Sequence, residues 1–216
     1  MSNLYSVGQM NQLGDSLEAE GFTADDVTKL KQYANLAGIK AVLNGTAKIK
    51  PVGEDATRTI TINETTIAVN LGATPKPPFK GAEVEQDIGE GWSIVERRTD
   101  GLYVDGKKIV LHLSKRQRNG KRLKGYELRE ELTGKLVLNA NILDALLHNR
   151  HLILEDWKKD ENGNTRYIFF WGTIYRNSGG GLYVRYLYFS GGEWYSDYDW
   201  LDYAWHSIDP SAVRAS

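Results

Sequence analysis

A run of positive charges in the middle of the chain is the first candidate for binding chemistry. Its six basic residues fall within ten positions: Lys115, Arg116, Arg118, Lys121, Arg122 and Lys124. Cationic groups at this density attract phosphates, and counterions are released when a nucleic acid binds. The run lacks the glycine-rich phosphate-binding pattern that ends in Gly-Lys-Ser/Thr. Glu127, Glu130 and Glu131 follow at once, so a solvated charged loop neutralised by these acids is the competing interpretation.

The second candidate is an aromatic segment near the C-terminus. Fifteen of the 23 aromatic residues lie between positions 167 and 205, and rings and acids are mixed in its last part. The side chains there that could contact a ligand or partner are Trp194, Tyr195, Tyr198, Trp200 and Trp205, with Asp197 and Asp199. Flat rings beside carboxylates suit carbohydrates, and exposed rings also stack on bases. The competing interpretation is that most of these rings form the core.

Residues for catalysis or metal binding are few. Glu193 with Asp197, Asp199 or Asp202 could be written as the carboxylate pair of a hydrolase, although spacing alone carries little weight. A metal site could use His148 and His151, which lie three positions apart at the end of a predicted helix, together with Asp144 one turn earlier. Histidines in that position usually complement the helix dipole instead. We therefore assign no catalytic residue, no metal ligand and no cofactor, and we favour a protein that is not an enzyme.

The composition is that of an ordinary globular protein. The 216 residues include 27 basic and 28 acidic side chains, which leave a net charge of −1 and no global field for steering a charged partner. No cysteine is present, so disulfides and thiolate metal sites are excluded. Neither a signal peptide nor an apolar run of about 20 residues is visible. The expectation is a soluble, cytoplasmic protein without a membrane segment.

Two helices are predicted over residues 9–45. Met10, Leu13 and Leu17 form one stripe, and a second helix begins at Thr23, where Asp26 completes a capping box. Such a helical hairpin needs a partner surface, and an apolar face left open on it would favour a homo-oligomer.

In the next segment the apolar residues alternate with other residues, as they do in a strand, instead of recurring every three or four positions. Alternating β-branched residues on either side of 63–65 predict a β-hairpin. Three of the five prolines follow in 72–82, which predicts a stiff linker. The expected organisation is an N-terminal part over 1–71, the linker over 72–82 and a C-terminal α+β domain over 83–216.

Strands and short helices alternate in the C-terminal part. Strands are predicted at 92–97 and 108–113, and helices at 126–132 and 139–148, the latter with Asn139 as N-cap. A β meander follows over 166–176, 182–189 and 193–200, with glycine-rich turns between the strands. Its first two strands are apolar on both faces, which indicates a central position, and its third indicates an edge.

An ordered series of segments in the second half carries a family resemblance. It includes 111–117, 127–132, 138–147 and 155–158, then Phe-Phe-Trp-Gly-Thr-Ile-Tyr-Arg at 169–176 and Tyr-Val-Arg-Tyr-Leu-Tyr at 183–188. Over residues 88–216 the chain resembles a family of uncharacterised bacterial proteins that is frequent in candidate-phylum bacteria. The resemblance implies an intact domain and no activity, so it assigns no functional residue.

The sequence therefore predicts an α+β protein with an N-terminal helical hairpin, a Pro-rich linker and an antiparallel β meander on which short helices pack. The predicted function is a non-enzymatic binding or interaction module. A partner protein is the first candidate, nucleic acid at the 115–124 loop the second, and carbohydrate at the 193–205 segment the third. The rival class is a hydrolase of carbohydrate or nucleic acid that uses Glu193 and the nearby aspartates.

Overall fold

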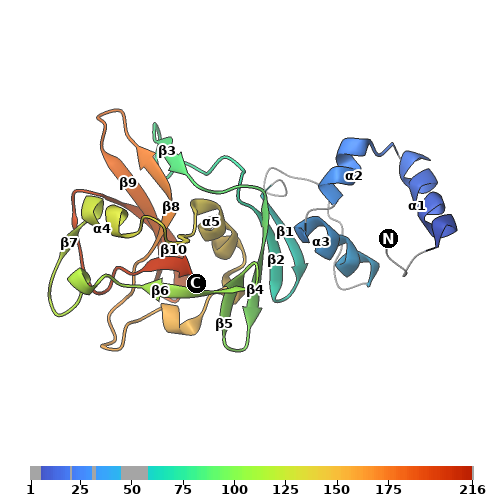
Figure 1. Ribbon diagram of the computed structural model, residues 1–216. Helices are drawn as coiled ribbons and strands as arrows, with labels where there is room; N and C mark the ends of the chain where they lie inside the picture. Colours follow the sequence, from blue (N-terminus) through green and yellow to red (C-terminus); the bar gives the residue numbers. More distant parts are fainter. Residues whose placement is uncertain (1–5, 20, 31–32, 45–57, 216) are drawn as a thin grey trace.

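The computed structural model shows an α+β protein and describes residues 6–19, 21–30, 33–44 and 58–215 (Figure 1). The helices are α1 Val7–Ala19, α2 Ala24–Leu30, α3 Tyr33–Leu43, α4 Gly125–Glu131 and α5 Ala140–His148, with short 3-10 helices η1 Lys115–Gln117, η2 Arg150–Leu152 and η3 Glu155–Trp157. The strands are β1 Thr59–Asn63, β2 Thr66–Asn70, β3 Glu83–Asp87, β4 Trp92–Arg98, β5 Gly101–Val104, β6 Lys107–His112, β7 Leu123–Lys124, β8 Ile168–Arg176, β9 Leu182–Ser190, β10 Glu193–Trp200, β11 Ala204–Trp205 and β12 Ser211–Arg214. The predicted fold class is confirmed.

The N-terminal helices begin where the sequence predicts. The capping box is present, because the Asp26 carboxylate accepts from the Thr23 N–H at 2.9 Å and the Thr23 hydroxyl accepts from the Asp26 N–H at 3.2 Å. The single helix predicted after Thr23 is described as α2 and α3, and residues 31–32 between them lie outside the described residues.

The apolar residues of these helices are mostly exposed. Helix α3 packs on the sheet, where Ala41 is buried against Ile62, Ala68 and Ile94. Helix α1 buries none of its residues, and α1 and α2 extend away from the sheet (Figure 1). The exposed apolar side chains on the three helices include Met10, Leu13, Val27, Leu36, Ile39 and Leu43. An open apolar face is therefore present, and the homo-oligomer remains a prediction.

One large curled sheet forms most of the protein. Its strand order is β1-β2-β4-β5-β6-β12-β8-β9-β10, and β3 pairs with β8. All of these pairs are antiparallel except β12 with β8. The β1–β2 hairpin, which the sequence groups with the N-terminal helices, joins this sheet because β2 pairs with β4 along its whole length. Strands from both sides of residues 72–82 thus share one sheet.

The Pro-rich segment is attached to the sheet that it crosses. The Tyr175 hydroxyl donates to the Lys76 carbonyl at 3.0 Å. The ring of Phe79 packs on Tyr183 and Tyr198, with centroids 5.2 and 4.8 Å apart. The segment is therefore held by contacts to β8, β9 and β10.

Strand β8 lies in the centre of the core and is buried on both faces, as its composition predicts. On one face Ile168 and Phe170 join the cluster that surrounds α5, and on the other Phe169 and Trp171 pack under α4, β7 and β11. Asn139 caps α5 as predicted, since its side chain accepts from the Ile142 N–H. These two hydrophobic clusters hold the segments that cover the two faces of the sheet. The second cluster includes Leu123, which lies within the basic run.

A buried ion pair joins α5 to β9 within the first layer. Arg185 donates to the Asp144 carboxylate at 2.7 Å and to the Ser196 hydroxyl at 3.0 Å, and both charged side chains are almost fully buried.

None of the described helices has the length and apolar character needed to cross a membrane.

Candidate anion-binding site

The first half of the basic run is held in a defined conformation. Residues 115–117 form η1, and Ser114 caps it: its hydroxyl accepts from the Arg116 N–H at 3.1 Å, while its own N–H donates to the Gln117 side chain at 3.0 Å. Gln117 is fully buried, and its amide donates to the carbonyls of His206 and Asp209 at 3.0 Å each. A buried anchor therefore fixes the direction of the charged residues beside it.

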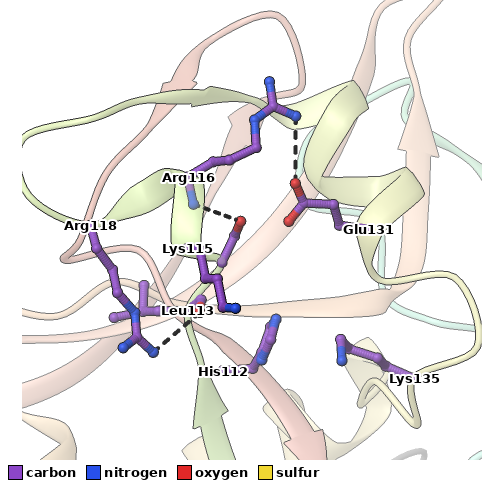
Figure 2. Close-up of a pocket in the computed structure, with 8 residues that line it drawn as sticks. His112, Leu113, Lys115, Arg116, Arg118, Glu131 and Lys135 are labelled. Atoms are coloured by element: carbon purple, nitrogen blue, oxygen red, sulfur yellow. Dashed lines mark hydrogen bonds and ion pairs between the residues drawn. The ribbon is translucent and has the colours of Figure 1, made fainter.

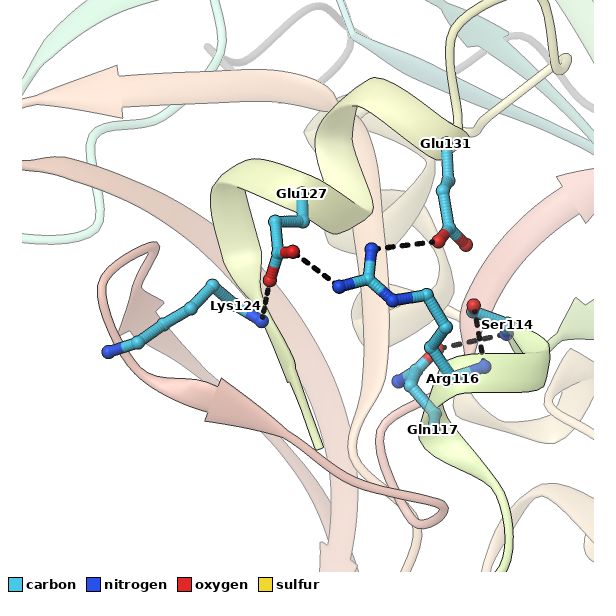
Figure 3. Close-up of polar contacts among 6 residues, drawn as sticks. All are labelled: Ser114, Arg116, Gln117, Lys124, Glu127 and Glu131. Carbon is cyan, nitrogen blue, oxygen red and sulfur yellow. Dashed lines mark hydrogen bonds and ion pairs between the residues drawn. The ribbon is translucent and has the colours of Figure 1, made fainter. Parts of the chain in front are cut away.

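Two of the six predicted cations are used within the chain (Figure 3). Arg116 forms ion pairs with Glu127 and with Glu131, the latter at 3.4 Å. The Arg116 hydrogen bond and the Lys124 backbone N–H lower the pKa of Glu127. The Lys124 ammonium donates to the Asp202 carbonyl at 2.5 Å. The predicted neutralisation by acids of α4 thus applies to Arg116.

The other four cations keep their charge uncompensated. Within the described residues, the side chains of Lys115, Lys121 and Arg122 form no ion pair or hydrogen bond, and Arg118 donates only to the Leu113 carbonyl at 3.5 Å. Asn119 and Gly120 reverse the chain between them through positive φ angles of 57° and 73°. All four side chains are exposed to solvent.

A hollow of about 570 Å³ lies beside η1 (Figure 2). Its lining residues, which we call the basic pocket, are His112, Leu113, Ser114, Lys115, Arg116, Arg118, Glu131 and Lys135. They come from three segments: the end of β6 and its continuation, η1, and the end of α4 with the turn that follows it. The acid in this lining, Glu131, is already paired with Arg116. The basic pocket therefore carries an excess of positive charge.

His112 and Lys135 of the basic pocket are absent from the sequence-based candidates. His112 ends β6, and Lys135 lies in the turn after α4, where its N–H donates to the Leu132 carbonyl at 3.0 Å. Figure 2 shows Lys115, His112 and Lys135 beside one another in the pocket. No local signal in the sequence linked His112 or Lys135 to the basic run.

The electrostatic field of the basic pocket acts on His112. Burial lowers the pKa of this imidazole first, and the positive charges of Lys135 and Arg118 lower it further, while Glu131 opposes them. This lowering of the pKa favours the neutral imidazole, in which one ring nitrogen donates and the other accepts. An anion in the hollow would offset part of the effect of these positive charges on the ring.

The aromatic segment proves to be largely core. Trp194 and Trp205 are 5% and 2% exposed and belong to the two hydrophobic clusters, so neither ring is available for stacking on a ligand. Trp200 is half-buried, and Tyr198 packs on Phe79. Tyr195, at 42% exposure, is the most accessible predicted ring, and it packs beside Tyr188. Of the five predicted rings, Tyr195 and Tyr198 are thus the exposed ones.

The acids of this segment are engaged by the protein itself. Asp197 and Asp199 accept from the backbone N–H groups of Tyr198 and Trp200, each at 2.8 Å. Glu193 pairs with Arg150 at 3.0 Å. Each carboxylate that the hydrolase hypothesis requires at this strand, apart from Asp202, therefore has a separate contact within the chain.

The two histidines near α5 also contact backbone. The rings of His148 and His151 lie 2.7 and 2.9 Å from the carbonyls of Asp144 and Glu64, and Asp144 pairs with Arg185. Over the described ranges, no three His, Asp or Glu side chains converge in a way that could hold a metal ion.

Comparisons with known proteins give no match: no family model, no curated protein and no solved structure matches this chain. The functional interpretation therefore rests on the basic pocket and the cations around it.

Proposed function

We propose that this protein is a non-enzymatic binding module that binds the phosphate backbone of single-stranded nucleic acid. The observation that carries the proposal is the convergence of Lys115, Arg118 and Lys135 on one hollow, whose lining carboxylate, Glu131, is already paired with Arg116. We call these residues, together with His112, Lys121 and Arg122, the basic surface. Phosphates bound there would gain Coulomb attraction and release their counterions.

Exposed rings beside the basic run favour single strands over duplexes. Tyr126 and Tyr203 are 40% and 57% exposed. Both lie next to Lys124: Tyr126 two positions along the chain, and Tyr203 across the β7–β11 pair, where the Gly125 N–H donates to the Tyr203 carbonyl. Bases of a single strand can stack on such rings, whereas bases within a duplex cannot.

Nucleic acid is also better supported than the other two predicted partners. A carbohydrate site would rely on the rings of 193–205, of which Trp194 and Trp205 are buried. A protein partner at the same strand would meet Tyr195 and Tyr198 and little other exposed aromatic surface. The basic surface, in contrast, is exposed along most of its length.

A salt titration tests the proposal. Binding of a labelled single-stranded oligonucleotide is measured by fluorescence anisotropy at increasing salt, for the native protein and for the variant Lys115→Ala/Arg118→Ala/Lys135→Ala. We expect the logarithm of the binding constant to fall linearly with the logarithm of salt concentration. In the variant the slope should be smaller by about 2, because each phosphate contact on a single strand contributes about 0.7.

The matched control removes three exposed lysines outside the basic surface: Lys80→Ala/Lys107→Ala/Lys159→Ala. Lys107 begins the strand that His112 ends, so it lies at the opposite end of β6. This variant loses the same charge and should bind like the native protein. A salt-independent affinity, or an equal loss in both variants, would refute the proposal.

A further inference from the structure

We infer that the basic pocket binds a phosphate monoester, the terminal phosphate of a nucleic-acid strand. This inference rests on the function proposed above and specifies which part of the strand the pocket takes. The remaining cations of the basic surface, Lys121 and Arg122, do not line the pocket. They would contact the strand after it leaves the pocket.

The charge in the basic pocket is better matched to a monoester than to an internal phosphate. Lys115, Arg118 and Lys135 bring three positive charges to the lining, while Arg116 pairs with Glu131 of the lining and with Glu127 outside it. An internal phosphodiester carries one negative charge, and a phosphate monoester carries about 1.5 to 2 at pH 7. Since Coulomb attraction scales with the charge of the ligand, the terminal phosphate gains more from the same cations.

Neutral donors complete the pocket. The Ser114 hydroxyl oxygen accepts from the Arg116 N–H, which leaves the hydroxyl hydrogen to donate to a ligand. His112 lies beside Lys115 and Lys135 and can donate through a ring nitrogen (Figure 2). A monoester has three terminal oxygen atoms and can accept from ammonium, guanidinium, hydroxyl and imidazole groups at once.

The size of the hollow agrees with a strand end. Pockets for small ligands have volumes of about 300–1,000 Å³, and the basic pocket, at about 570 Å³, falls within this range. It can hold a phosphate and the sugar attached to it.

The test compares two labelled oligonucleotides of the same sequence, one phosphorylated at both ends and one with hydroxyl groups at both ends. The native protein should bind the phosphorylated strand on the order of tenfold more tightly, because of the additional charge in the pocket. The variant Lys115→Gln/Lys135→Gln should lose this preference. The matched variant Lys121→Gln/Arg122→Gln should bind both strands more weakly and keep the preference.

The outcomes separate this inference from the proposed function. Equal, salt-dependent binding of the two strands would overturn the inference and leave the proposed function intact. If neither strand bound, both the inference and the proposed function would be overturned. If a nucleoside monophosphate bound as tightly as the phosphorylated strand, the site would belong to a free nucleotide, and the assignment to a strand end would be overturned.

The pH dependence of the preference supplies a second readout. The dianionic monoester takes up one proton near pH 6 and then carries the same charge as a diester. The preference should therefore shrink as the pH falls below about 6. His112, which faces Lys135, Arg118 and Glu131, also takes up a proton as the pH falls. Its added positive charge would strengthen binding of both strands. A preference that is unchanged at pH 5 would contradict recognition of the dianion.

Discussion

The carboxylate of Asp199 accepts a hydrogen bond from the backbone N–H of Trp200 at 2.8 Å, and Asp197 does the same for Tyr198. Among the strands that the structure describes, β10 is the last of the sheet and pairs only with β9. Its N–H groups at these two positions are therefore occupied by the side chains of the preceding residues. Open edges otherwise offer free N–H groups to a strand of another chain, which leads to association.

Removal of these two carboxylates should allow β10 to pair with an edge strand of another molecule. We expect Asp197→Ala/Asp199→Ala to associate at concentrations where the native protein does not, because the freed N–H groups can pair with another edge. Sedimentation velocity over a concentration series measures this. The control Asp156→Ala/Asp202→Ala loses the same charge from side chains that, in the described part of the chain, form no hydrogen bond. Equal association of both variants would assign the effect to net charge.

The buried pair of Asp144 and Arg185 should be sensitive to removal of one partner. Asp144→Ala leaves the Arg185 charge buried without compensation, and we expect it to lower the free energy of unfolding by about 3–5 kcal/mol. The double variant Asp144→Ala/Arg185→Met should recover part of this loss. Chemical denaturation measures each value.

The exposed pair of Arg150 and Glu193 gives the comparison for that experiment. Glu193→Ala should change the free energy of unfolding by no more than about 1 kcal/mol, since solvent screens the pair. If Asp144→Ala were as mild as Glu193→Ala, burial of the first pair would have no energetic consequence, contrary to our expectation.

Stability should depend on pH through Asp209. Burial raises the pKa of this carboxyl to about 6, and the charge of nearby Asp199 adds to the effect, while the His206 N–H opposes it. The folded state therefore binds more protons than the unfolded state between about pH 4 and 6, where the unfolded carboxyl has a pKa near 3.9. The stability that this group contributes falls as pH rises through that window.

Asp209→Asn removes this penalty. We expect the variant to gain at least about 1 kcal/mol in free energy of unfolding at pH 8 and little at pH 4, since one pKa unit corresponds to about 1.4 kcal/mol. Asp160→Asn is the control with the opposite sign, because hydrogen bonds from Asn164 and Asn162 lower the pKa of Asp160. It should lose stability at pH 8. Thermal unfolding at several pH values separates the two.

Much of the secondary structure follows from local pattern. The capping box at Thr23, the N-cap at Asn139 and the strands of the meander depend on residues close together in the chain, and all are confirmed. The central position of β8 also follows, because a strand that is apolar on both faces must be covered on both. In contrast, β12 lies parallel to β8, a pairing between distant segments that local pattern does not encode.

For the candidate site, the sequence alone determined that a dense group of cations lies in one loop and that acids follow it. Tertiary structure decided which charges remain: Arg116 is paired by Glu127 and Glu131, whereas Lys115 and Arg118 are not. It also placed Lys135 in the same pocket and buried Trp194 and Trp205. The physical reason is that burial and ion pairing depend on distances between segments that are remote in the chain. These distances are set by the order of the strands in the sheet and by the packing of α4 against it.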